Sequence, residues 1–429
     1  MSTIVSTPGG AQAYRPRAVD LELRTRLAAV GAVLIEGPKA CGKTETARRV
    51  VASEVRLDVD AAARQAAAID PSLVLGGPVP RLLDEWQVVP ALWNHVRRAV
   101  DDRQEPGQFV LTGSAVPADE STRQAGAGRF ARLRMRPMSL FESGDGDAAV
   151  SLAGLLAGDA PSAAGEGANL QRLAELIARG GWPANLRLAL PHAMQANIDY
   201  LGELSRLDIS RVDGVKRDPA RAQRLFASIA RNVATEATIS TIARDSSDGA
   251  GAADWRVAAS YLTALDRLMV VEDAPAWAPH LRSKARLRTA ATRHFVDPAL
   301  AVAALGAGPS RLLADLNYLG LLFESLAVRD LRVYAQASLG RVAHFRDSNG
   351  LEVDAVVECA DGRWAAFEVK LGGEEAVNRA AASLVHFAAT VDSEKCGPPA
   401  ALVVVTGVGG YAYVRPDGVA IVPLVRLGP

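Results

Sequence analysis

Cysteine is scarce in this chain of 429 residues, which has three: Cys41, Cys359 and Cys396. They are odd in number, lie far apart and include no CxxC pair, so the sequence supports neither a disulfide framework nor a zinc site. Long hydrophobic runs are missing too. No stretch of about 18 uncharged apolar residues occurs, which argues against a membrane span. Residues 1–10 lack a basic start followed by an apolar run, so we expect no signal peptide and a cytoplasmic location.

An excess of charge of either sign is also absent, because 48 Lys and Arg residues balance 48 Asp and Glu residues. Global charge therefore gives no argument for nucleic acid, which would have to come from local patches. Hydrophobic residues make up 49% and charged residues 22%, a balance typical of soluble globular proteins. At roughly 150 residues a domain, the length predicts about two to four domains.

One complete motif lies near the N-terminus, where residues 37–44 read G-x-x-x-x-G-K-T. An apolar run at 32–36 precedes it, and a helical pattern from Lys43 to about Glu54 follows it. Glycines let backbone N–H groups surround a β-phosphate, and the start of a helix adds its positive dipole end. A Gly-rich turn without a ligand is the alternative. The residues predicted to hold ATP are Gly37, Pro38, Lys39, Ala40, Cys41, Gly42, Lys43, Thr44 and Glu45.

Within this motif, Lys43 is expected to reach the β- and γ-phosphates and Thr44 to bind Mg²⁺. About 40 residues later comes an acidic pair at the end of a short apolar run. Asp84 would hold the Mg²⁺ through water, and Glu85 would polarise the attacking water as general base. By itself, such a pair would also fit the start of a solvated helix.

Two further polar positions follow in the same region. The apolar run at 109–112 ends in hydroxyl groups, and Thr112 and Ser114 are predicted to sense the γ-phosphate, with an ordinary strand-to-turn transition as the alternative. Arg129 lies in a polar loop and would contact the γ-phosphate from the same chain or from a second copy. An exposed arginine without such a role is the alternative. The predicted catalytic set is therefore Lys43, Glu85 and Arg129.

Alternation of apolar runs and helical patterns predicts an α/β fold, a parallel sheet of the P-loop NTPase kind. Together the motifs resemble a group of prokaryotic predicted AAA-class P-loop ATPases that carry a C-terminal domain of unknown function. Lys39 departs from the Arg usual there, and Pro80 and Arg81 interrupt the strand before Asp84. The pieces that carry the resemblance are residues 37–44, 82–87, 111–114, 128–129, 138–142, 180–183, 295–298 and 323–370.

Composition and motif order predict four segments. Residues 1–145 form the AAA-like ATPase domain, 146–210 a linker and helical segment, 211–300 a winged-helix-like domain, and 301–429 a nuclease-like domain. Residues 144–169 are rich in Gly, Ala, Asp and Ser, which indicates a linker or variable insertion.

Three helical patterns and a strand at 221–272 predict a winged helix, as the resemblance also implies. Winged helices bind DNA through their third helix. Here that helix offers Arg256 and Arg267 beside Asp254 and Asp266, which is no basic face. A packing or protein-interaction module is therefore an open alternative, and the more basic segment 282–293 is a candidate wing for phosphate contacts.

Residues 310–429 predict a helix, three strands, a helix and a strand, an order that resembles the PD-(D/E)XK nuclease core. Two neighbouring strands would bring Asp354 beside Glu368 and Lys370, which share one strand face. The carboxylates would hold Mg²⁺, with Glu324 completing the shell, and Lys370 would orient water for attack on a phosphodiester. A charged sheet edge is the alternative.

These motifs predict a protein that binds and hydrolyses ATP with Mg²⁺, and whose nucleotide state controls a DNA-binding, nuclease-like C-terminal region. An ATP-gated, Mg²⁺-dependent nuclease in defence or toxicity is one alternative, and a non-catalytic switch for protein partners is another. Besides ATP, the candidate partners are DNA, a second copy of the chain and another protein, with no membrane.

Overall fold

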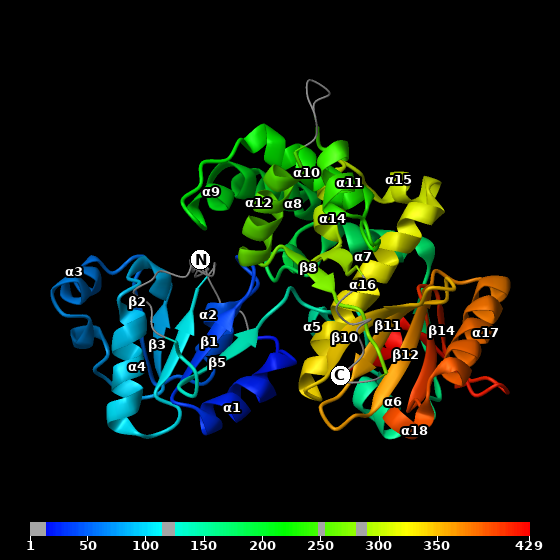
Figure 1. Ribbon diagram of the computed structural model, residues 1–429, viewed down its shortest axis with the longest axis horizontal. Helices are drawn as coiled ribbons and strands as arrows, with labels where there is room; N and C mark the ends of the chain where they lie inside the picture. Colours follow the sequence, from blue (N-terminus) through cyan, green and yellow to red (C-terminus); the bar gives the residue numbers. More distant parts are fainter. Residues whose placement is uncertain (1–13, 114–124, 248–253, 280–289) are drawn as a thin grey trace, which may run out of the picture.

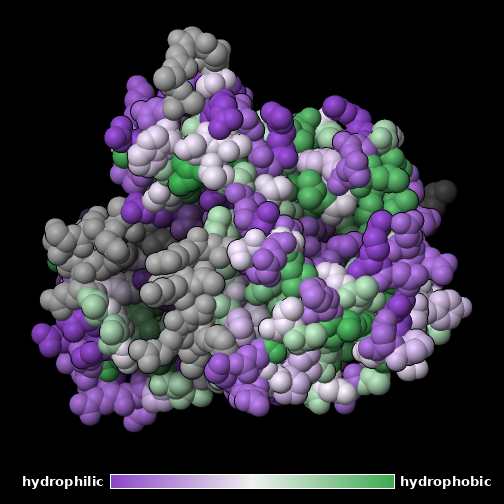
Figure 2. Space-filling model, turned by 45° about the vertical axis from the view of Figure 1, so that its right-hand side comes forward, coloured by the Kyte–Doolittle hydropathy of each residue, from purple (hydrophilic) through white to green (hydrophobic). Residues whose placement is uncertain are grey.

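The computed structural model describes residues 14–113, 125–247, 254–279 and 290–429. Figure 1 shows the N-terminal sheet and its helices at the left and the C-terminal sheet at the right. A helical middle part lies above them. On the face shown in Figure 2, hydrophobic residues form small patches that hydrophilic ones interrupt. No helix in the described ranges has the length and apolarity needed to cross a lipid bilayer.

The N-terminal part is a five-stranded sheet in the order β2-β3-β4-β1-β5. All four neighbouring pairs run parallel, so the carboxyl ends of the strands meet at one edge. The strands are β1 (Ala32–Glu36), β2 (Ser53–Arg56), β3 (Arg81–Asp84), β4 (Phe109–Thr112) and β5 (Phe130–Arg134). The helices are α1 (Val19–Ala29), α2 (Lys43–Ala47), α3 (Ala61–Ile69) and α4 (Leu92–Arg103).

Both faces of this sheet are covered, which explains why its central strand reads as a continuous apolar run. Successive side chains of a strand point to opposite faces. Ala32 and Leu34 of β1 pack with α4 residues in one cluster. Val33 and Ile35 pack with α1 residues in another. The sheet thus holds the loop after β1 on a rigid base.

The strands predicted at 32–36, 81–84 and 109–112 are confirmed. The prediction of a helix from Lys43 to about Glu54 is wrong, because α2 ends at Ala47 and β2 begins at Ser53. After α2 the backbone N–H of Val50 bonds to the carbonyl three residues back, at Ala47. That tighter turn ends the helix and lets the chain enter the sheet beside β3.

The middle part is helical, with one two-stranded antiparallel sheet of β8 and β9. Three helices and a strand pair are the elements predicted for a winged helix. Four of the predicted wing's basic residues, Arg282, Lys284, Arg286 and Arg288, lie outside the described residues. The elements are α7 (Leu170–Arg179), α8 (Leu190–Glu203), a π-helix (Leu204–Asp208), α9 (Ile209–Arg211), α10 (Pro219–Arg231), α11 (Ile239–Asp245), α12 (Trp255–Arg267), β8 (Val271–Ala274), β9 (Thr292–Phe295), α14 (Ala299–Ala304) and α15 (Pro309–Ala314).

The C-terminal part is a seven-stranded sheet in the order β10-β11-β12-β13-β15-β14-β7. Strands β10 to β12 are antiparallel neighbours, and β12, β13 and β15 run parallel. The predicted order of helix, three strands, helix and strand is present. The elements are α16 (Leu316–Ala337), β10 (Arg341–Arg346), β11 (Glu352–Glu358), β12 (Trp364–Lys370), α17 (Glu374–Thr390), α18 (Ser393–Cys396), β13 (Ala401–Thr406), β14 (Gly409–Val414), β15 (Ala420–Pro423) and β16 (Leu427–Gly428).

The segment predicted as a linker, 144–169, is instead part of this C-terminal fold. Its elements β6 (Val150–Ser151), α6 (Leu152–Ala157) and β7 (Ala163–Ala168) follow the short helix α5 (Leu140–Ser143). Strand β7 pairs with β14 at the edge of the large sheet, and β6 pairs with β16. The linker prediction is therefore wrong, because an early segment completes a sheet built mainly by the end of the chain.

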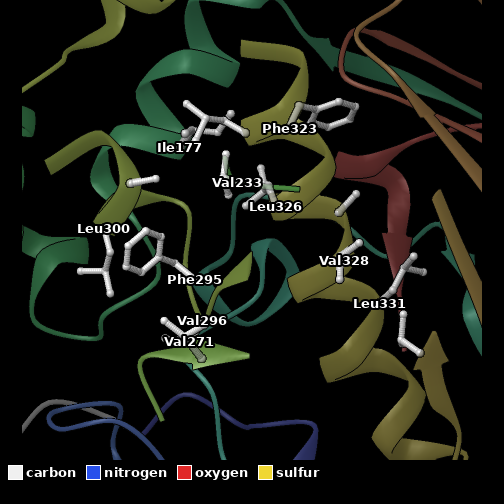
Figure 3. Packing of buried hydrophobic residues seen from close by; sticks show 14 of the residues in the cluster. Ile177, Val233, Val271, Phe295, Val296, Leu300, Phe323, Leu326, Val328 and Leu331 are labelled. Atoms are coloured by element: carbon white, nitrogen blue, oxygen red, sulfur yellow. The ribbon is translucent and has the colours of Figure 1, made fainter. Parts of the chain in front are cut away.

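One hydrophobic core joins the middle and C-terminal parts. Figure 3 shows Phe323 and Leu326 of α16 toward Ile177 and Phe295 of the middle part, and Leu331 further along α16, toward the C-terminal strands; all belong to one cluster. All five side chains are nearly or fully buried. Shared burial of this kind makes α16 a common element of the two parts.

Candidate nucleotide-binding site

The loop between β1 and α2 has the backbone that a phosphate loop requires. Gly42 has a φ of 105° and Ala40 a φ of 60°, both in the left-handed region. Gly37 allows a close approach, since a Cβ there would lie 2.3 Å from the carbonyl oxygen of Met135. Two glycines thus serve two different purposes, one for a left-handed turn and one for packing against the next segment.

Lys43 is 6% exposed and folds its ammonium group back onto the loop. Its Nζ donates hydrogen bonds to the carbonyl oxygens of Gly37, at 2.9 Å, and Pro38, at 2.8 Å. This places the ammonium over the hollow of the loop, where a β- or γ-phosphate oxygen could replace the carbonyls.

The end of β3 lies beside the start of α2. Thr44 Oγ1 donates to Asp84 Oδ1 at 2.9 Å, and the buried hydroxyl of Thr112, on the neighbouring strand β4, donates to the same oxygen. A hydroxyl and a carboxylate this close fit the donor set expected for Mg²⁺ bound with ATP. In this structure Thr112 therefore contacts the carboxylate of Asp84.

Glu85 follows directly and has a φ of 53°, which turns its side chain away from the strand direction. The amide of Gln87 donates to its carboxylate. Glu85 also lines the cavity in front of the loop. Its position agrees with the predicted general base, which must face the nucleotide but lie outside the Mg²⁺ pair.

The cavity has a volume of about 850 Å³. Lys39, Ala40, Gly42, Lys43, Thr44 and Glu45 form its floor. The opposite wall was not predicted. It consists of Asp58 from the turn after β2, and of Pro183, Ala184, Arg187 and Leu188 from the middle part.

Two contacts hold this wall on the loop. Trp182 Nε1 donates to the carbonyl oxygen of Lys39 at 3.1 Å. The Lys39 ammonium forms an ion pair with Asp208 of the π-helix, with 2.6 Å between Nζ and Oδ1. π-Helical turns are rare and are often found at functional sites. Residues 180–183 belong to the pieces that carry the family resemblance, but their role in covering the loop depends on contacts between residues that are distant in sequence.

Some predicted loop residues lie behind the cavity. Gly37, Pro38 and Cys41 shape the loop, and the carbonyl of buried Cys41 accepts a bond from Arg17 at 3.0 Å. Ser114 lies outside the described residues.

The prediction that Arg129 contacts the nucleotide in its own chain is wrong. Arg129 precedes β5, whose first residue pairs with Ala32 at the amino end of β1. The loop begins at the carboxyl end of β1, across the length of the strand. Arg129 pairs there with Asp101 of α4, at 2.7 Å between Nε and Oδ1. Contact with a second copy stays a prediction.

The structure brings the four predicted residues of the C-terminal site together. Lys370 Nζ lies 3.0 Å from Asp354 Oδ2 and 2.6 Å from Glu368 Oε2. The backbone N–H of Val369 also donates to Asp354, at 2.7 Å. Burial, followed by the charge of Asp354, raises the pKa of Glu368 to about 7 and that of Glu324 well above its usual value.

These carboxylates do not form a metal shell as they stand. In the described ranges, no three acidic, His or Cys side chains are placed to hold one ion. Lys370 lies between Asp354 and Glu368 and occupies the position that a cation would take. A cavity of about 300 Å³ opens beside the cluster and is lined by Glu324, Asp354 and residues of the middle part.

Three family models match the chain in succession. Residues 30–143 match the AAA domain. Residues 170–311 match a domain of unknown function, DUF8612, and residues 319–427 match another, DUF4143. No curated protein matches the chain.

Among solved structures, the Walker-type ATPase Paby2304 of Pyrococcus abyssi is similar at 13% identity with a TM-score of 0.39. The match covers 66% of this chain and 94% of that one. A likeness this distant carries no argument about fold or function. The AAA match and the phosphate loop together support ATP binding and hydrolysis by residues 30–143, ahead of two regions of unknown function.

Proposed function

We propose that the chain is an ATP-driven switch, in which ATP hydrolysis at residues 37–44 changes how the middle part holds the loop. One observation carries this proposal: the cavity in front of the loop is lined both by the AAA domain and by residues 183–188. A nucleotide bound there would touch both parts at once. Its arrival and loss would therefore bear on their arrangement.

The roles follow from the contacts already described. Lys43 would exchange two carbonyl oxygens for phosphate oxygens, and Thr44 with Asp84 would hold the Mg²⁺ that arrives with ATP. Mg²⁺ would neutralise charge on the phosphates. Glu85 would accept a proton from the attacking water. Thr112 would keep Asp84 in place through its buried hydroxyl.

Coupling to the middle part would pass through Lys39. Its side chain is 42% exposed and its ammonium pairs with Asp208, whose side chain is 9% exposed. Lys39 also lines the cavity, so a triphosphate would compete with Asp208 for the same cation. Release of Asp208 would free the π-helix and α8 to move.

The catalytic part is tested by ATP binding and turnover with two variants. Lys43→Ala should abolish binding, because the phosphates lose their cation. Glu85→Gln should keep binding and lower turnover at least about a hundredfold, the usual scale for a lost general base. Lys395→Ala and Glu375→Gln are the controls, since both side chains are exposed and distant. Unchanged ATP affinity in Lys43→Ala would refute the site.

The coupling is tested separately with Asp208→Asn. Loss of the competing carboxylate should raise ATP affinity by up to about fivefold, since a partly exposed ion pair is worth up to about 1 kcal/mol. Asp199→Asn, an exposed change on α8, is the control. Equal or weaker ATP binding in Asp208→Asn would remove Lys39 as the link while leaving the ATP site intact.

A second candidate function is Mg²⁺-dependent cleavage of nucleic acid at the C-terminal cluster. The convergence of Asp354, Glu368 and Lys370 favours it, and the position of Lys370 between the carboxylates opposes it. The test is cleavage of single- and double-stranded DNA and RNA with Mg²⁺ or Mn²⁺, with and without ATP. Cleavage should disappear in Asp354→Asn and in Lys370→Ala. No cleavage under any condition would leave the cluster as ion pairs between two interior strands of the sheet.

A further inference from the structure

A basic cavity of about 560 Å³ opens in the middle part, away from the loop and from the carboxylate cluster. Two helices line it, α10 and α12, and Figure 1 shows both at the top of the molecule, above the two large sheets. Its walls come from the segment before α10, the first turns of α10, and the first turns of α12. The charged side chains that line it are five cations and one carboxylate: Lys216, Arg217, Arg221, Arg224, Arg256 and Asp218.

Arg217 is the fixed member of this group and is 7% exposed. Its guanidinium donates two bonds to Asp213, at 2.7 and 2.8 Å, and others to the Ile209 carbonyl and the Ser260 hydroxyl. Its Nε is buried and has no hydrogen-bond partner. The cavity thus has a rigid cationic base, one of whose donors is unused.

Three of the other cations have no carboxylate partner among the described residues. In the part of the chain that the structure describes, Lys216, Arg221 and Arg256 form no ion pair with a carboxylate. Asp218 cannot neutralise them fully, since its oxygens accept the backbone N–H groups of residues 220 and 221 as the cap of α10. With Arg217 paired to Asp213 and Arg224 set aside, Lys216, Arg221 and Arg256 face the single carboxylate of Asp218, an excess of two positive charges.

An exposed aromatic side chain adjoins the cavity. Trp255, the first residue of α12, is 51% exposed, although most large aromatic side chains of this chain are buried. The guanidinium of Arg256 lies over its ring, 5.3 Å from the centroid. Proteins that bind single-stranded nucleic acid combine cations, which neutralise the phosphates, with aromatic side chains, on which the bases stack. This cavity and the exposed tryptophan beside it offer both.

We propose that this cavity binds the phosphate backbone of a single-stranded nucleic acid, with Trp255 as a stacking platform for a base. Arg221, Arg256 and Lys216 would contact successive phosphates, and Arg217 would supply the fixed charge at the base of the cavity. The site lies between α10 and α12, the third helix of the predicted winged helix. Most of its cations come from α10 and the segment before it, so α12 itself does not have to be basic. The site is independent of the ATP site and requires neither Mg²⁺ nor nucleotide.

The test is fluorescence anisotropy of the full chain with a labelled single-stranded oligonucleotide of about 20 nucleotides, without ATP. Arg221→Ala with Arg256→Ala should weaken binding at least tenfold. The salt dependence of the logarithm of the association constant should become shallower by about 1.4, because each phosphate contact on a single strand contributes about 0.7. Arg379→Ala with Lys395→Ala removes the same charge from exposed positions and should change affinity less than twofold.

Trp255→Ala should weaken strand binding about tenfold while leaving the salt dependence unchanged, since stacking carries no counterion release. Equal losses in the two double variants would overturn the proposal in favour of general charge attraction. Full displacement of the strand by millimolar inorganic phosphate would overturn it in favour of a small-anion site. No binding by the unaltered chain would also overturn it, and none of these results bears on ATP binding.

Discussion

Arg329 of α16 is a buried cation whose loss we expect to destabilise the whole chain. Its side chain is 3% exposed, and the two carboxylates it contacts are fully buried. Nη1 lies 2.8 Å from Asp297 Oδ2, and Nη2 lies 2.7 Å from Asp330 Oδ1. Arg329→Met fills much of the same volume but removes the only charge that these contacts supply to the pair.

The cost follows from what remains. Asp297 would keep the backbone N–H of Gly181, at 2.9 Å, and Asp330 would keep that of Leu140, at 3.0 Å. Each carboxylate would thus keep a hydrogen bond from a backbone N–H group but lose its ion pair with the guanidinium. Breaking a buried ion pair by removing one partner costs about 3–5 kcal/mol, and these remaining bonds place the expected loss near about 3 kcal/mol.

The same substitution should also weaken ATP binding. Gly181 is held by Asp297 and directly precedes Trp182, which bonds to the Lys39 carbonyl of the phosphate loop. Without its cation, Asp297 would be more stable in contact with water. Its movement would displace Gly181 and weaken the hydrogen bond from Trp182 to the Lys39 carbonyl. We expect ATP affinity to fall several-fold in Arg329→Met, although Arg329 touches no residue of the loop.

Urea unfolding followed by circular dichroism and tryptophan fluorescence would measure the free energy, and calorimetry the ATP affinity. Arg329→Met combined with Asp297→Asn should recover part of the loss, because one of the stranded charges is gone. Arg379→Ala, at an exposed i,i+4 pair, should cost about 0.5 kcal/mol or less. An Arg329→Met loss below about 1 kcal/mol, or a double variant less stable than the single one, would refute the reasoning.

Three other predictions concern separate sites. Thr112→Val should lower ATP turnover about tenfold with little change in ATP affinity, because Asp84 loses one hydrogen bond worth about 1.5 kcal/mol; unchanged turnover would contradict this. Lys370→Ala should lower the free energy of unfolding by about 2 kcal/mol in urea titrations, since the buried carboxylate of Glu368 and the mostly buried one of Asp354 lose their shared cation, and a more stable variant would contradict it. Burial opposes the ionisation of Asp145, but bonds from Arg179 and others outweigh it and hold its pKa below 3.8. Its stabilisation is therefore present above about pH 4 and lost as the pH falls through the lowered pKa, so Asp145→Asn should cost about 2 kcal/mol at pH 7 and progressively less as the pH falls below about 4.

The phosphate loop was predictable because its chemistry is local. A strand, a glycine turn and a helix start lie within about fifteen residues, and the motif specifies the role of each. The acidic pair at Asp84 was predictable for a related reason, since parallel strands end at the same edge of a sheet. The far wall of the cavity could not be predicted from the sequence. Arg187 is more than 140 positions from Lys43, and no local pattern connects them.

Two of the three wrong assignments share a physical cause. Strand β7 reads Ala-Ala-Gly-Glu-Gly-Ala, without a β-branched or aromatic residue, so its propensity predicts a loop. It is a strand because β14 supplies a partner, about 245 residues later. Arg129 was placed near the phosphates because it follows β4 in sequence, but the sheet order places it at the amino end of β5. Pairing partners and strand ends are properties of the tertiary fold.

Helix α16 offers a physical route between the two candidate sites. It is about 33 Å long, and Figure 1 shows it running from the middle part down beside the C-terminal sheet. Near its start Glu324 faces the carboxylate cluster. At its end Gln336 bonds to the Arg134 carbonyl, at 2.8 Å, and to Arg136, at 3.0 Å, both after the last predicted motif of the ATP site.

Most of this helix is packed in an apolar core, which resists partial displacement. The contacts of Gln336, at its end, with Arg134 and Arg136 are polar by contrast, and Glu272 of β8 joins them by binding Arg136 through both oxygens, at 2.6 and 2.8 Å. Ion pairs can exchange partners where a close-packed core cannot. A nucleotide-dependent change would therefore act first at this polar junction, and the middle and C-terminal parts would respond as one body rather than as separate domains.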